Sequence, residues 1–135
     1  MTQNDRQASA ALATLILLQV IMLSALYAGI PPHPPQATPL FGIAPFLGAS
    51  VSVAVSAIIL QPLSNGTGRA LTILAAVMAL VSFGPQKYFD AQFGLIWPAV
   101  ILGQLSALVL FARVFRAISP RATAGFAGQA NNGQA

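Results

Sequence analysis

The sequence predicts an all-α membrane protein, with four transmembrane helices in an antiparallel bundle and both termini in the cytoplasm. Three observations lead to this fold class. Hydrophobic residues make up 56% of the 135 residues and charged residues only 6%, whereas a soluble domain carries roughly 25% charged residues. Four apolar runs are long enough to cross a bilayer, and most basic residues fall on one side of the membrane that these runs define.

The first predicted span covers residues 8–30 and contains no charged residue. Gly29 and Pro31 mark its end, because glycine and proline commonly stop helices. The run is longer than the apolar core of a signal peptide and no clear A-x-A site follows, so we expect a helix that is not cleaved. The connection that follows, residues 31–39, contains five prolines and is predicted to be a stiff, extended strap.

The second predicted span covers residues 40–60, and Gln61 and Pro62 end it. Pro45 falls in the first turns of this helix, where a missing backbone N–H costs little. A spanning helix needs about 20 mostly apolar residues, and this run satisfies that length. The sequence therefore predicts an uninterrupted helix here.

The third predicted span covers residues 69–89 and is the least regular of the four. Its strictly apolar part, residues 70–83, is short for a full crossing. Extending the helix past Gly84 and Pro85 supplies the length, with a kink at the proline and with the Lys87 ammonium reaching the headgroups.

The fourth predicted span covers residues 93–117, with Asp90 as its expected N-cap and Ser119-Pro120 as its stop. The transmembrane domain is accordingly predicted to occupy residues 1–118. The tail, residues 119–135, is rich in Gly, Ala, Gln and Asn and is predicted to be a disordered cytoplasmic segment.

Charge gives the orientation, because basic residues near helix ends are retained in the cytoplasm. Four spans place five of the basic residues on the side of the termini: Arg6, Arg69, Arg113, Arg116 and Arg121. We interpret them as topology anchors. The last three form a cluster, and the alternative interpretation is that this cluster is a docking site for an acidic partner. The other side carries Lys87 and Asp90, whose charges cancel and which are spaced to pair across one turn.

Small residues recur at four-residue spacing in two spans, which places them in one ridge along a helix face. These residues are Ala44, Gly48, Ser52 and Ser56 in the second span and Ala99, Gly103 and Ala107 in the fourth, with Ala75 and Ala79 in the third. Close contact of small residues drives helix association in lipid. We expect these faces to be buried between helices of this chain, with packing against another protein as the alternative.

Two intramembrane amides, Gln19 and Gln104, fall at a similar depth. An unpaired amide in hydrocarbon costs several kcal/mol, so both are predicted to point inward, with a bond between them as one arrangement. Packing is the simpler interpretation, and contact with a ligand is the alternative.

Catalytic, metal-binding and cofactor-binding groups are not predicted. There is no cysteine, and His33, in the proline strap, is the only histidine. No ionisable residue lies in the middle of a span, which argues against a proton-coupled transporter and a voltage sensor. The basic residues are few and scattered, so nucleic acid is not an expected partner.

The predicted function is a non-enzymatic one: an accessory or scaffold subunit of a membrane complex, with the lipid bilayer and another membrane protein, or the chain itself, as partners. The alternative is a small homo-oligomeric pore or transporter for a neutral solute, lined by Ser52, Ser56 or Gln104. The alanine-rich composition and the short loops favour a multi-pass protein of the bacterial inner membrane.

Overall fold

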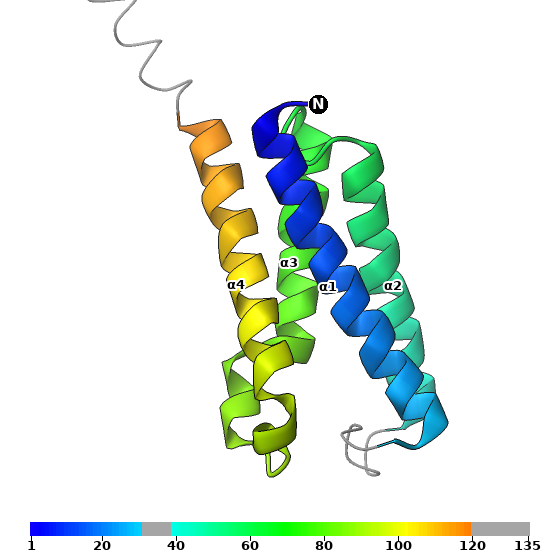
Figure 1. Cartoon of the computed structure of the whole chain (residues 1–135). Coiled ribbons are helices and arrows are strands. Elements are labelled where there is room, and N and C mark those ends of the chain that lie inside the picture. The colour runs from blue at the N-terminus through cyan, green and yellow to red at the C-terminus, as the bar shows by residue number, and fades with distance from the viewer. Residues whose placement is uncertain (31–38, 120–135) are drawn as a thin grey trace, which may run out of the picture.

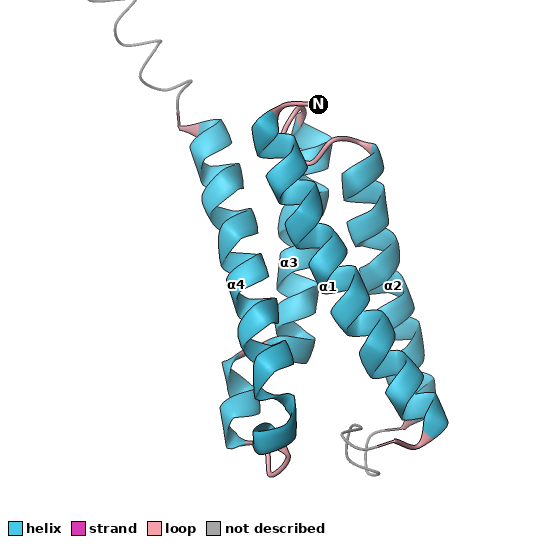
Figure 2. Cartoon of the chain, in the orientation of Figure 1, coloured by secondary structure: helices cyan, strands magenta, loops and turns pink. Residues whose placement is uncertain are grey.

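The computed structural model describes residues 1–30 and 39–119. Within these ranges it contains helices and no strand (Figure 2). The elements are α1 (Gln3–Ala28), α2 (Leu40–Ile59), α3 (Gly66–Phe83), the 3-10 helix η1 (Pro85–Phe89) and α4 (Phe93–Ile118). Four helical segments are long and apolar enough to cross a membrane, the third being α3 together with η1. The chain is therefore a four-helix, multi-pass membrane protein, as predicted. Most of the proline strap (residues 31–38) and the tail from residue 120 lie outside the described residues.

The helices alternate in direction and form an antiparallel bundle (Figure 1). The N-terminus, the α2–α3 turn and the last residues of α4 lie at one end, which we call the terminal end. The α3–α4 connection with η1 lies at the other, the η1 end. Each helix packs against the next along the chain, and α1 also contacts α3 and α4. The bundle is thus closed by the pairing of α1 with α4.

The first helix begins at Gln3, five residues before the predicted span, because a capping box fixes its first turn. The Asp5 backbone N–H donates to Thr2 Oγ1 at 3.1 Å, while the Asp5 carboxylate accepts from the Thr2 backbone at 3.3 Å. Such reciprocal bonds satisfy N–H groups that have no partner inside the helix. At the other end Gly29 adopts a left-handed φ of 64°, and the Ile30 N–H donates to Ala25 O at 3.0 Å, as glycine stops require.

The third helix ends at Phe83 and does not continue through the proline as a kinked helix; η1 follows as a separate turn. The carbonyl groups left at this helix end accept hydrogen bonds from side chains. Gln86 Nε2 donates to Leu80 O at 3.2 Å and to Val81 O at 2.8 Å, and Gln104 Nε2 donates to Phe83 O at 3.2 Å. Backbone groups near hydrocarbon need partners within the protein, so these amides allow the helix to stop early.

The interior is built largely from alanine, which lets the helices approach closely. The buried cluster also contains larger side chains from α1 and α4, and its members include Leu12, Leu15, Ala54, Ala57, Ala75, Ala76, Ala79, Ala107 and Leu110. Many large apolar side chains point outward instead, among them Leu17, Ile21, Val81, Leu105 and Leu108. This distribution suits a protein whose outer surface is solvated by lipid tails.

Candidate functional site

The ridge of small residues on α4, which we call the sealed ridge (Ala99, Gly103 and Ala107), packs inside the chain. Gly103 and Ala107 are buried and Ala99 is half-buried. A Cβ atom placed on Gly103 would lie 2.9 Å from Phe83 Cβ, closer than real Cβ contacts allow. The glycine therefore provides the space in which the Phe83 side chain of α3 lies.

The ridge on α2, which we call the open ridge (Ala44, Gly48, Ser52 and Ser56), is placed differently. Gly48 and Ser52 are exposed, while Ala44 and Ser56 are half-buried. The expectation that this whole ridge is buried between helices of the chain is therefore wrong. The reason is the rotation of α2, which instead turns a neighbouring face inward; the buried members of that face are Leu47, Ser50, Ala54 and Ala57.

The hydroxyl groups of the open ridge are occupied by their own helix. Ser52 Oγ donates to Gly48 O and Ser56 Oγ donates to Ser52 O, both at 2.8 Å. A Cβ atom placed on Gly48 would meet nothing within 4 Å. The hydroxyls of the open ridge therefore already have acceptors within α2, and no other described part of the chain lies close to its glycine.

The two intramembrane glutamines do not bond to each other, so that expected arrangement is wrong. Gln19 is 1% exposed and its Nε2 donates to Ser50 Oγ of α2 at 2.8 Å. Gln104 is half-buried and accepts from the Tyr88 hydroxyl at 2.8 Å, in addition to its bond with Phe83 O. The two side chains thus serve different contacts, α1 with α2 in one case and α4 with the end of α3 in the other.

At the terminal end, Asp5 makes contacts that the sequence interpretation missed. Its side chain is 2% exposed and accepts from the Leu63 backbone N–H at 3.0 Å, from Ser64 Oγ at 3.1 Å and from Thr2 Oγ1 at 2.8 Å. We call these four residues the Asp5 clasp. The Thr2-x-x-Asp5 spacing could have indicated the cap, but not the contact with the α2–α3 turn.

Basic side chains gather at the same end. Arg69 Nε donates to Leu63 O at 3.1 Å, and Arg113 donates to Asn4 Oδ1 at 2.7 Å, so two of the predicted topology anchors also hold elements together. Of the others, Arg6 and Arg116 are exposed, and Arg121 lies outside the described residues, as does His33.

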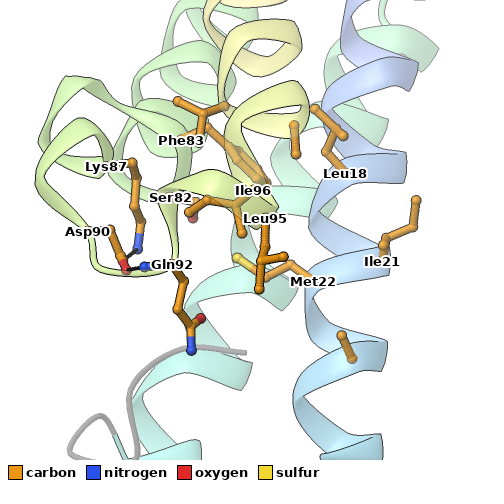
Figure 3. A pocket seen from close by; sticks show the side chains of 13 residues that line it. Leu18, Ile21, Met22, Ser82, Phe83, Lys87, Asp90, Gln92, Leu95 and Ile96 are labelled. Carbon is orange, nitrogen blue, oxygen red and sulfur yellow. Dashed lines mark hydrogen bonds and ion pairs between the residues drawn. The ribbon is translucent and has the colours of Figure 1, made fainter. Parts of the chain in front are cut away.

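A cavity of about 250 Å³ lies between α1 and α4 near the η1 end (Figure 3). Its wall is mostly apolar, with Leu18 and Met22 from α1 facing Ile96 from α4. Polar groups meet at one side of it: Lys87 Nζ lies 3.6 Å from Asp90 Oδ2, as the spacing of these residues predicts.

Asp90 does not cap α4, contrary to expectation. The N-cap is Gln92, which makes no side-chain capping bond. Asp90 Oδ1 instead accepts from the Gln92 backbone N–H at 2.9 Å, so the carboxylate stays beside the cavity. Within residues 1–30 and 39–119, no group of three or more His, Cys, Asp and Glu residues could hold a metal ion.

In comparisons with known proteins, the chain matches no family model, no curated protein and no solved structure.

Proposed function

We propose that this protein is a non-catalytic accessory or scaffold subunit of a larger membrane complex, and that it binds a transmembrane helix of another protein along the open ridge. One observation carries the proposal: Gly48 and Ser52 are exposed on the outer surface of α2, and the space beside Gly48 is empty. Helices in lipid associate where small residues let their backbones approach. A second helix crossing at Gly48 fits this surface.

The contrast with the sealed ridge supports the proposal. At Gly103 the space that a small residue provides is filled by the Phe83 side chain of a neighbouring helix. The corresponding space at Gly48 has no such neighbour among the described residues of the chain. On α2, the exposed large side chains Val55 and Ile59 each lie three residues after a serine of the open ridge, which places them beside the ridge on the helix surface. They would add apolar contact to a helix lying along the ridge.

The pore alternative receives less support from the side chains that were expected to line it. Ser52 and Ser56 donate to carbonyl groups of their own helix. Gln104 is engaged with Tyr88 and Phe83 near the η1 end. Because α2 and α4 each pack against α1 and α3, these polar groups are on separate flanks of the bundle and do not line one path in a single copy.

We place the protein in a bacterial inner membrane with the terminal end in the cytoplasm. Among the described residues, four of the basic side chains are at that end, while Lys87 at the η1 end is paired with Asp90. This asymmetry agrees with the retention of basic residues in the cytoplasm. Labelling of single cysteines from outside intact cells tests it: a cysteine at Gln86 should react and one at Gln3 should not.

The natural chain has no cysteine, so a cross-linker can be attached at one chosen position. A photoreactive maleimide on Ser52→Cys probes the open ridge, and the same reagent on Leu108→Cys probes an exposed position of α4. Irradiation of native membranes is expected to give one product from Ser52→Cys, joined to a single different protein. Leu108→Cys is expected to give only lipid adducts.

Gly48→Leu should abolish the Ser52→Cys product, because the larger side chain fills the space that a partner helix would use. A product with the mass of two copies of this chain would support the homo-oligomeric alternative instead. Equal products from both positions, or none from Ser52→Cys, would contradict a specific role for the open ridge.

A further inference from the structure

The cavity between α1 and α4 opens onto the outer surface of the bundle. Of the residues that line it, Ile21 is 62% exposed and Leu95 is 66% exposed. In a membrane protein such a surface faces lipid tails rather than water. An apolar space that stays empty loses the dispersion contacts of its walls, so an apolar chain entering from the side is stabilised there.

The volume indicates what part of a ligand enters. At about 250 Å³, the cavity is smaller than the roughly 300–1,000 Å³ typical of pockets that enclose a drug-sized molecule. A segment of one hydrocarbon chain fits such a space, while the remainder of the molecule stays in the bilayer.

The polar side of the cavity indicates the headgroup. Lys87 and Asp90 form an ion pair whose side chains are 25% and 20% exposed, so both remain accessible. The neighbouring aromatic residues Tyr88 and Trp97 are 45% and 50% exposed, which is typical of the depth where headgroups begin. A cation and an anion side by side complement a headgroup that also carries one charge of each sign.

We propose that this cavity is a binding site for a phospholipid whose headgroup contains both a phosphate and a primary ammonium group. One acyl chain lies between α1 and α4, the phosphate accepts hydrogen bonds from the Lys87 ammonium, and the lipid ammonium donates to the Asp90 carboxylate. A quaternary ammonium has no N–H to donate, and a glycerol headgroup lacks the positive charge. The site therefore distinguishes headgroups as well as accepting a chain.

Native mass spectrometry of the detergent-purified chain tests the proposal. Phosphatidylethanolamine, phosphatidylcholine and phosphatidylglycerol with identical acyl chains serve as the probes. The first is expected to give a single saturable adduct and to bind about tenfold more tightly than the other two, the effect of one charge-assisted hydrogen bond. Equal affinity for all three lipids would overturn the headgroup assignment.

Two pairs of variants locate the site. Ala25→Phe fills the cavity from α1, and its control Ala13→Phe adds the same side chain at an exposed position of that helix. Ala99→Phe fills it from α4, with Ala112→Phe as its control. Each filling variant should lose the adduct at least about tenfold while its control keeps it, a difference of about 1.4 kcal/mol. Circular dichroism and gel filtration show which variants are folded.

Charge variants separate the two halves of the site. Lys87→Gln and Asp90→Asn are each expected to bring the three lipids to similar affinities without removing the adduct, since the chain still binds. If the folded filling variants retain the adduct as well as their controls do, the lipid binds elsewhere and the proposal is wrong.

Discussion

The sealed ridge of α4 and the open ridge of α2 have the same sequence pattern and opposite surroundings. Both place a glycine between small residues at four-residue spacing, yet Gly103 lies against Phe83 and Gly48 faces empty space. The pattern alone marks where a helix can be approached closely. Which neighbour approaches is decided by residues elsewhere in the chain, here an aromatic side chain at the end of α3.

The largest expected effect comes from filling the sealed ridge. Gly103→Leu would force the new side chain against Phe83, and overpacking of this kind typically costs about 1–3 kcal/mol, occasionally more. We expect the free energy of unfolding to fall by about 3 kcal/mol, measured by SDS titration in mixed micelles. Gly48→Leu is the matched control and should leave the free energy of unfolding nearly unchanged. Similar losses in both variants would remove the distinction between the ridges.

The next largest effect is expected at the Asp5 clasp. A variant there tests whether buried contacts away from the two ridges also contribute to the free energy of unfolding. Asp5→Ala leaves the Leu63 N–H buried without its acceptor, and losing a hydrogen bond to a charged group costs about 1.5–3 kcal/mol. We expect a loss of about 2 kcal/mol in the same titration. Asp5→Asn keeps an acceptor oxygen and should lose less.

The matched control for Asp5→Asn is Asp90→Asn at the other end of the bundle, where the ion pair with Lys87 is partly exposed and such pairs contribute about 0–1 kcal/mol. If the variant at Asp90 lowers the free energy of unfolding as much as the one at Asp5, burial of the carboxylate does not decide the size of the loss.

The smallest expected effect compares two serines of α2 that are two residues apart. Ser50→Ala removes the interhelical partner of the buried Gln19 amide and should cost about 0.6–2 kcal/mol. Ser52→Ala removes only a bond to its own helix backbone and should change the free energy of unfolding by a few tenths of a kcal/mol. If Ser52→Ala proves the more damaging in the isolated chain, the inward and outward faces of α2 have been assigned wrongly.

The sequence predicted the number of helices and their approximate limits, because apolar length and the Gly and Pro stops are local properties of the chain. It did not predict helix rotation. Gln19 and Gln104 fall at one depth, but depth does not say that Gln19 faces Ser50 while Gln104 reaches Tyr88. The early end of α3 was missed for a related reason, since the amide that bonds Phe83 O comes from another helix.

The candidate sites also separate into features that are local in the sequence, which could be predicted, and features that depend on contacts between helices, which could not. The Lys87–Asp90 pair was predictable, because its members are three residues apart. The cavity beside it was not, since its walls come from α1, α3 and α4. The exposure of the open ridge likewise depends on which face of α2 meets α1, and no pattern within α2 specifies that face.

The Asp5 clasp also bears on the order in which the protein matures at the ribosome. The Asp5 carboxylate is synthesised before its partners Leu63 and Ser64, which follow 58 and 59 positions later. Until the second helix and the turn after it have been synthesised, the start of the first helix has only Thr2 to hold its negative charge. The first turn of α1 therefore gains its full set of contacts only after the α2–α3 turn has been made.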